Sequence, residues 1–338
     1  MVLTKNLTNQ FNEVKKHVKH TADSVACSGG ACMVIQNDQV ILEDYFGRQS
    51  IADEARKVQA DTQFHVASVR KSYIGFAAAY AVYTGCISSI DEPVTRYLPM
   101  IAGELTAGVT IRHLLTHTHG LTKNDDRLIR EFPAGTNWAY RAIGVEWLTQ
   151  IIKATTGKTV AELLRTLIFE PLDFKETGWY GTKHKQLADV ILQHPNDRSW
   201  YRSNSIDGDK MNMYISAREL ALFGYLHLNQ GVINGRTIVP REVLELAVSV
   251  HSPTLEDRNS PQNGFLWFVK EHPALKTEIG SQVPAGSYQI LGYTNTSLLV
   301  VPEHNLVAVR MLNSFGSPPE YDYLEDIRSF GDTLIRCL

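Results

Sequence analysis

The sequence has no apolar run long enough to cross a membrane. A spanning helix needs about 20 consecutive apolar residues, and no segment of the 338 residues reaches that length. Residues 1–11 also lack the apolar core of an export signal. We therefore expect a cytoplasmic protein with no membrane partner.

An excess of positive charge is also missing. The chain carries 33 basic and 36 acidic side chains, which gives a net charge of −3, and it has no basic stripe. Nucleic-acid-binding surfaces are typically strongly basic. We expect no nucleic-acid partner.

Cysteine is scarce, with only Cys27, Cys32, Cys86 and Cys337. These are too few and too scattered for a disulfide framework. Cys27 and Cys32 would lie on opposite faces of a regular strand, because their separation is odd. We expect buried free thiols, and neither a metal nor a cofactor.

The most informative segment that is present is Ser68-Val69-Arg70-Lys71, which opens an apolar helix ending at Gly85. Residues three apart share a helix face, so we expect Lys71 within hydrogen-bond reach of Ser68. A neutral lysine can take the serine proton, and the positive end of a helix dipole favours both a neutral amine and a developing alkoxide. The pattern also fits a helix start at which Ser68 caps and Lys71 extends to solvent.

A series of short motifs follows the serine helix. They are Ile90-Asp91-Glu92-Pro93, Leu115-Thr116-His117-Thr118-His119-Gly120-Leu121, Pro133-Ala134-Gly135-Thr136, Tyr140, Phe169-Glu170-Pro171-Leu172 and Ser216-Ala217-Arg218-Glu219-Leu220. Their order and spacing resemble the class C β-lactamase-related serine hydrolases, a superfamily of penicillin-binding carboxypeptidases, carboxylesterases and D-aminopeptidases. The resemblance runs from about residue 25 to the C-terminus.

This resemblance implies a role for Tyr140, which matches the tyrosine of the family's Tyr-x-Asn motif. The tyrosine would pass a proton between Ser68 and the leaving group. Ala142 stands where the family has its asparagine, which weakens the β-lactam and acyl-D-amino-acid readings. The alternative for Tyr140 is a loop tyrosine packed on Trp138.

The family's third element, Lys-Thr-Gly or His-x-Gly, corresponds to Ile290-Leu291-Gly292. The glycine is kept, and we expect it to let the substrate backbone approach closely. The basic residue is lost to Ile290. The oxyanion hole needs only backbone N–H groups, and Ser68 and Tyr293 are the candidates. We interpret the similar Lys276-Thr277-Glu278 as a surface turn.

The sequence leaves two possible roles open for each of the other candidate site residues. Arg141 binds an acidic substrate group or faces solvent. Aromatic residues could wall a hydrophobic pocket or simply pack in the core; they are Trp138, Trp200, Tyr201 and Tyr288. For His117 and His119 we favour structural roles in the loop under the site.

Periodicity predicts the order of elements. Leu3, Leu7, Phe11, Val14 and Val18 predict an amphipathic helix. Strands are expected over 25–36, 39–47, 265–269, 287–292, 296–301 and 306–312, and helices over 62–84, 144–156, 160–169, 217–229 and 319–337.

The early and late strands must meet in one sheet to bury their apolar faces. We expect an α+β, β-lactamase/transpeptidase-like fold, with an antiparallel sheet flanked by helices plus an all-helical domain. Residues 1–85 and 255–338 would form the α/β domain, and 86–254 a mostly helical insertion.

These observations favour a serine hydrolase that forms a Ser68 acyl-enzyme on a small-molecule or short-peptide ester or amide, and not an efficient β-lactamase. Two alternatives stay open. One is an acyltransferase that uses the same intermediate, and the other is a non-catalytic binding protein on a hydrolase scaffold. The oligomeric state is left open.

Overall fold

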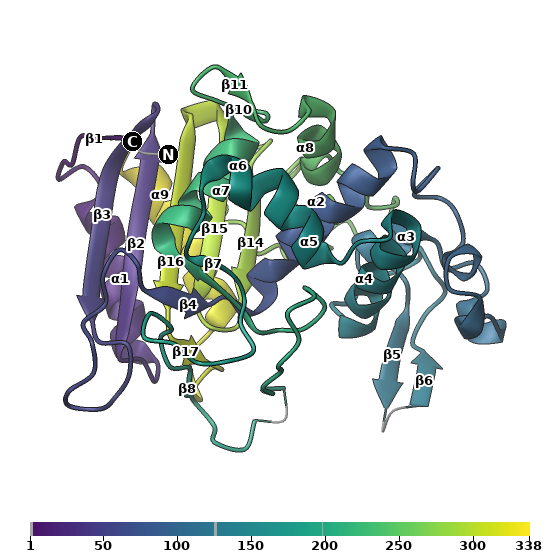
Figure 1. Cartoon of the computed structure of the whole chain (residues 1–338), viewed down its shortest axis with the longest axis horizontal. Coiled ribbons are helices and arrows are strands. Elements are labelled where there is room, and N and C mark those ends of the chain that lie inside the picture. The colour runs from purple at the N-terminus through teal and green to yellow at the C-terminus, as the bar shows by residue number, and fades with distance from the viewer. Residues whose placement is uncertain (1–2, 125–126, 198) are drawn as a thin grey trace.

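The computed structural model describes residues 3–124, 127–197 and 199–338. Its central feature is an eight-stranded sheet in the order β1-β3-β2-β16-β15-β14-β13-β12 (Figure 1). The bounds are β1 Thr4–Lys5, β2 Gly29–Gln36, β3 Gln39–Gly47, β12 Gln262–Asn263, β13 Phe268–Val269, β14 Tyr288–Gly292, β15 Thr296–Val301 and β16 Leu306–Leu312.

The early and late strands pair at the centre of this sheet, as the sequence predicts. β2 runs antiparallel to β16, with Cys32 opposite Arg310. Every neighbouring pair in the sheet is antiparallel except β1 and β3, which are parallel. The expected antiparallel sheet is therefore correct apart from its two-residue edge strand.

Helices cover both faces of the sheet. α1 (Asn12–Ser24) and α9 (Tyr323–Arg336) pack together on one face, and α7 (Ala217–Leu228) packs against β2, β15 and β16 on the other. The N-terminal prediction was wrong at its start, because Thr4–Lys5 pairs with β3 and the helix begins only at Asn12. Phe11, Val14 and Val18 are fully buried, so α1 closes the core on this face.

The remaining helices come from residues between β3 and β12, and most of them lie beside the sheet in the right half of Figure 1. They are α2 Arg70–Tyr83, α3 Ile111–Leu115, α4 Ala142–Thr156, α5 Val160–Leu164, α6 Glu170–Leu172 and α8 Arg241–Val248. Short strands outside the central sheet are β4 Gln63–His65, β5 Leu121–Asn124, β6 Arg127–Arg130, β7 Thr177–Trp179, β8 Ile191–Leu192, β9 Met213–Ser216, β10 Val232–Ile233, β11 Arg236–Thr237 and β17 Ser314–Phe315. Since α7 packs on the sheet, the predicted insertion 86–254 contributes to both parts of the molecule.

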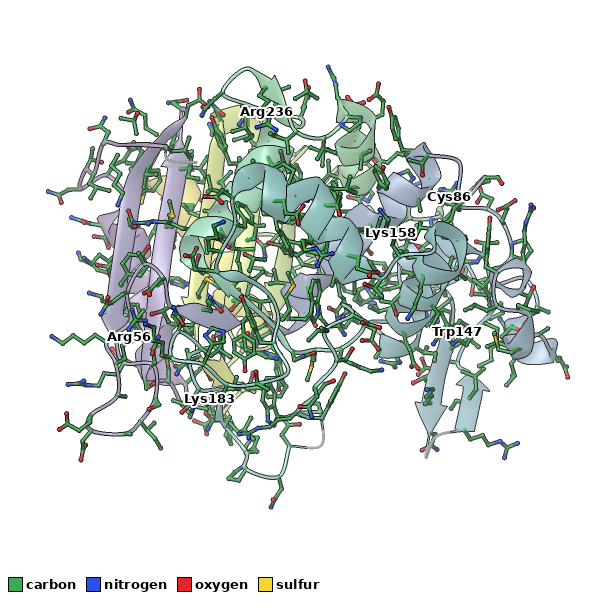
Figure 2. The ribbon with its side chains drawn as sticks, viewed as in Figure 1. Arg56, Cys86, Trp147, Lys158, Lys183 and Arg236 are labelled. Atoms are coloured by element: carbon green, nitrogen blue, oxygen red, sulfur yellow. The ribbon has the colours of Figure 1, made fainter. Side chains whose placement is uncertain are left out.

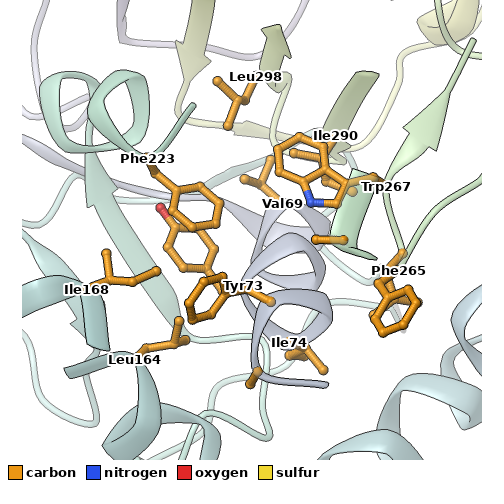
Figure 3. Packing of buried hydrophobic residues seen from close by; sticks show 14 of the residues in the cluster. Val69, Tyr73, Ile74, Leu164, Ile168, Phe223, Phe265, Trp267, Ile290 and Leu298 are labelled. Carbon is orange, nitrogen blue, oxygen red and sulfur yellow. The ribbon is translucent and has the colours of Figure 1, made fainter. Parts of the chain in front are cut away.

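The serine helix α2 is buried along most of its length. Its residues from Arg70 to Ala79 are all buried. Tyr73 stacks on Phe223 of α7 with a 3.8 Å separation of ring centroids, and Figure 3 shows both beside Ile74 and Trp267. Burying a large apolar side chain contributes roughly 1.5–3 kcal/mol. This packing fixes the helix whose first turn carries Lys71.

Arg56, Lys183 and Arg236 lie near the edge of the molecule in Figure 2. Among the described residues, no helix is both long enough and apolar enough to cross a bilayer.

Candidate active site

Ser68 lies in a tight turn that joins β4 to α2. Residues Ala67–Val69 form one turn of 3₁₀-helix before α2 begins at Arg70. Ala67 has a φ of 44°, an uncommon conformation for a residue with a side chain. Its N–H donates to Nδ1 of His65 at 3.2 Å. Such strain is often found at functional sites.

Lys71 connects two hydroxyl groups. Its Nζ lies 2.7 Å from Oγ of Ser68 and 2.6 Å from Oη of Tyr140, both hydrogen-bond distances. The amine also lies 4.2 Å from the centre of the Tyr140 ring. The structure thus brings together the three residues that the sequence proposed as catalytic, and Tyr140 is more than a tyrosine packed on Trp138.

Burial sets the protonation of this cluster. Burial, with a smaller contribution from the charge of Arg70, holds the pKa of Lys71 well below its ordinary value. Burial raises the pKa of Tyr140 to about 12, against the lowering effect of its hydrogen bond to Ser68. The lowered pKa of Lys71 favours the neutral amine, and the raised pKa of Tyr140 favours the protonated phenol, so the amine is the better proton acceptor of the two.

Gly292 at the end of β14 lies directly against the turn before Ser68. A Cβ at this position would lie 2.2 Å from the carbonyl oxygen of Val66. The missing side chain lets β14 approach the turn that carries Ser68. The expected close approach of a substrate backbone at Gly292 stays a prediction.

The approach of β14 to this turn places two backbone donors near the nucleophile. Ser68 lies in the 3₁₀ turn and Tyr293 in the turn between β14 and β15, and the backbone N–H of neither has an acceptor among the hydrogen bonds of the described turns and loops. Unpaired backbone N–H groups are costly unless a ligand or water satisfies them. The arrangement is suitable for an oxyanion.

Two positions that are polar in the related family are apolar here. Ile290 is fully buried and packs in the core with Val69 and Leu298 (Figure 3). Ala142 is exposed at the first position of α4. Neither offers a hydrogen bond to a substrate.

Trp138 stays beside the catalytic groups, whereas Arg141 does not. The Trp138 ring lies 6.2 Å from that of Tyr140, and its Nε1 donates to Asn263 at 2.8 Å. Arg141 forms two 2.8 Å hydrogen bonds with the carboxylate of Glu131 on the surface. Its guanidinium is therefore occupied, so the substrate-binding reading of Arg141 is not supported.

The two other aromatic residues predicted for the pocket, Tyr288 and Trp200, lie in different environments. Tyr288 is only 3% exposed and packs edge-on against Trp267 in the core, so it does not wall the site. Trp200 contacts His65 with ring centroids 4.8 Å apart, and both line a cavity of about 650 Å³ together with Tyr201. Trp200 thus lies next to the turn that leads to Ser68.

The two loop histidines are buried, as their structural interpretation requires. His117 has its ring centroid 4.5 Å from that of Tyr140, and neither of its ring nitrogens has a described partner. Nδ1 of His119 accepts the N–H of Leu121 at 3.1 Å. They support the loop beneath Tyr140.

A family model described as Beta-lactamase matches residues 14–329. The chain belongs to the Beta-lactamase family. Family membership agrees with the resemblance inferred from the motifs, and the β-lactamase/transpeptidase-like fold is confirmed.

Individual relatives are diverse. The chain is 55% identical over 338 residues to an "uncharacterized protein" of Alkalihalophilus pseudofirmus, covering all of this chain and 99% of the relative. It is 28% identical over 196 residues to esterase EstB of Burkholderia gladioli, and the match covers 47% of this chain and 49% of the esterase. A penicillin-binding protein homologue from Caulobacter crescentus superimposes with a TM-score of 0.78 at 16% identity, over the full length of both chains.

Two ionisable residues at this Beta-lactamase-family site were missed by sequence reasoning. Arg70 is only 8% exposed and lies between the nucleophile and Lys71 in the chain. Its charge inside an otherwise apolar helix was the available signal. Glu278, interpreted as part of a surface turn, is only 7% exposed, and burial raises its pKa to about 8. Its charge in turn raises the pKa of Tyr140.

Proposed function

We propose that this protein is a serine hydrolase that forms an acyl-enzyme at Ser68 on an ester or amide substrate. One observation carries the proposal: the buried amine of Lys71 lies within hydrogen-bond distance of both Ser68 and Tyr140. A base in contact with its nucleophile is the requirement for activating a serine hydroxyl. The lowered pKa of Lys71 supports the role of base.

In the proposed reaction, Lys71 takes the proton of Ser68 while Oγ attacks the carbonyl carbon of the substrate. The resulting oxyanion accepts hydrogen bonds from the N–H groups of Ser68 and Tyr293. As the intermediate collapses, the phenol of Tyr140 gives its proton to the leaving group and regains one from the Lys71 ammonium. Water then attacks the acyl-enzyme by the reverse proton path, which restores Ser68.

The same site argues against efficient turnover of β-lactams. Ile290 is buried and apolar, and Ala142 cannot donate a hydrogen bond. A penicillin brings a carboxylate and an acylamide, and an unpaired polar group in a desolvated site costs roughly 1–3 kcal/mol. We therefore expect short acyl esters, such as p-nitrophenyl butyrate, to be turned over better than penicillins.

Two other functions use the same residues differently. An acyltransferase would pass the acyl group from Ser68 to an alcohol or amine instead of water. A binding protein on this scaffold would form no acyl-enzyme. The buried amine of Lys71 argues against the binding protein, because an unused polar group at this depth is costly.

The decisive experiment is labelling with a fluorophosphonate probe, with the adduct mapped by mass spectrometry. Labelling at Ser68 that is lost in Ser68→Ala supports an acyl-enzyme. A folded protein that is not labelled would favour the binding-protein alternative. Initial rates with p-nitrophenyl butyrate and nitrocefin then test the substrate class, and added alcohols separate transfer from hydrolysis. Efficient nitrocefin turnover with negligible esterase activity would refute the ester preference.

A further inference from the structure

Tyr140 lies in a loop between β6 and α4, so side-chain contacts must hold its ring against Lys71. Directly before it, the backbone N–H of Ala139 donates to the carbonyl oxygen of His117 at 3.0 Å. This bond fixes the loop but leaves the side-chain torsions of Tyr140 free. A catalytic group that moves by about 1 Å can lose about a hundredfold in rate. The proton donor therefore needs a second support.

Three rings surround the Tyr140 ring and provide this support. The ring centroid of His117 lies 4.5 Å away, that of Trp138 6.2 Å and that of Phe268 6.3 Å. Trp138 also contacts the two others, with its centroid 6.1 Å from His117 and 6.3 Å from Phe268. The indole is the common neighbour of this group, so the place of Tyr140 depends on the place of Trp138.

A hydrogen bond to the edge of the central sheet anchors Trp138. Its Nε1 donates to Oδ1 of Asn263 at 2.8 Å, and Asn263 is fully buried. Asn263 lies on β12 directly opposite Phe268 on β13. Residues that are opposite each other on neighbouring strands share a face of the sheet. One cross-strand pair thus holds Trp138 by a hydrogen bond and Tyr140 by packing.

The carboxamide of Asn263 is itself held in one orientation. Its Nδ2 donates to the carbonyl oxygen of Trp267 at 3.1 Å. Its backbone N–H donates to Oγ of Ser252 at 2.8 Å, and its carbonyl oxygen accepts the N–H of His251 at 2.8 Å. Turning the side chain would leave a buried polar group unpaired, which is unfavourable. Asn263 therefore presents a fixed acceptor to the indole.

We propose that Asn263 is a positioning residue that acts through Trp138. It fixes the indole, and the indole keeps the phenol of Tyr140 where it gives its proton to the leaving oxygen as the bond from the carbonyl carbon to that oxygen breaks. The inference rests on the proposed function, in which Tyr140 protonates the leaving group. Loss of the hydrogen bond between Asn263 and Trp138 should therefore slow this proton transfer more than the attack of Ser68.

The test compares two esters that form the same acyl-enzyme, p-nitrophenyl butyrate and ethyl butyrate. p-Nitrophenolate is a stable anion that leaves without a proton, whereas the alkoxide of ethyl butyrate needs one as it leaves. The ratio of kcat/KM, p-nitrophenyl over ethyl, therefore reports protonation of the leaving group. Tyr140→Phe should raise this ratio by about a hundredfold or more. Trp138→Phe keeps a ring but removes the N–H, and should raise it by about fivefold or more.

A matched control and a second variant complete the test. In Trp179→Phe another indole loses a single hydrogen bond, which its Nε1 donates to the carbonyl oxygen of Lys210 at 3.1 Å, and the ratio should stay unchanged. Asn263→Leu should raise the ratio as Trp138→Phe does. The double variant should raise it no further, because both changes remove the same hydrogen bond.

Equal losses for both esters in Trp138→Phe would overturn the inference and leave Asn263 and Trp138 with a role in stability alone. Should Asn263→Leu fail to fold, the ratio in Trp138→Phe decides by itself. An unchanged ratio in Tyr140→Phe would show that Tyr140 does not protonate the leaving group, and the inference would fall with that step. If neither ester acylates Ser68 in the wild type, the proposed function fails instead.

Discussion

Two buried arginines lie in different parts of this molecule and have opposite surroundings. Arg310, on the sheet face covered by α1 and α9, is fully buried and paired with the carboxylate of Asp326. Its Nε donates to the carbonyl of Asn295 at 3.2 Å, and only Nη2 lacks a described partner. Arg70, at the start of α2, has no such carboxylate among the residues that the structure describes.

The pKa of Asp326 reflects this pairing. Burial alone would raise it, but the charge and hydrogen bond of Arg310 outweigh burial and leave the pKa below its ordinary value. In the described part of the chain, no acid is paired with Arg70 in this way, and burial lowers the pKa of the neighbouring Lys71. The buried charge of Arg310 on the α1/α9 side is thus compensated, whereas that of Arg70 near Ser68 has no carboxylate partner among the described residues.

The largest expected effect of this contrast is on catalysis. Lys71→Ala should lower the rate of Ser68 acylation by about two to four orders of magnitude, the scale of a positioned base. Stability should stay the same or rise, because active-site groups are commonly held at a cost to the fold. Stopped-flow acylation and chemical denaturation measure the two quantities. Near-wild-type turnover would mean that Tyr140 or another group is the base.

Removing the partner of the other arginine should instead lower stability. Asp326→Ala leaves Arg310 buried and unpaired, which costs about 3–5 kcal/mol in the free energy of unfolding. Asp322→Ala is a matched control on the same helix, since it removes only the N-cap of α9 and should cost about 1 kcal/mol. A smaller loss for Asp326→Ala than for Asp322→Ala would contradict the comparison. Activity per folded molecule should be unchanged in both variants.

The cluster of Ser68, Lys71 and Tyr140 could be predicted from the sequence because short motifs identify its residues. Ser68 and Lys71 are one helical turn apart, and Tyr140 lies in a motif of recognisable order. The strands 296–301 and 306–312 match their predicted bounds, since both are fully buried and mostly apolar, with Arg310 the one charged residue in them.

The errors arise where distant residues decide the environment. Residues 4–5 form a strand only because β3 lies beside them. Arg141 follows Tyr140 in the chain, yet its partner Glu131 comes ten residues earlier. Glu278 is buried through contacts of its loop, in which its carbonyl accepts Nε2 of Gln289 at 3.1 Å. No local pattern contains these contacts.

Glu278 provides a pH test of the idea that the site carries uncompensated groups. Its folded-state pKa of about 8 lies above the ordinary value of about 4.3. The folded protein therefore binds a proton more tightly, and stability is lost as pH rises from about 4.3 through about 8. Glu278→Gln removes this loss, so its stability advantage over wild type should grow to about 5 kcal/mol by pH 9. Denaturation at pH 5 and pH 9 measures this difference, and an advantage independent of pH would contradict it.

The smallest effect is expected at Arg141, whose charge pair lies on the surface. The guanidinium and the Glu131 carboxylate are 39% and 28% exposed, so water screens both. Exposed ion pairs contribute about 0.2–1 kcal/mol, and the cost of Arg141→Ala in the free energy of unfolding should stay within that range. Ester turnover should remain within about twofold of wild type, because this guanidinium faces Glu131 and not the nucleophile. A loss of turnover similar to that of Lys71→Ala would show that Arg141 leaves Glu131 when substrate binds. A carboxylate partner in the structure would then not be enough to show that Arg141 takes no part in turnover.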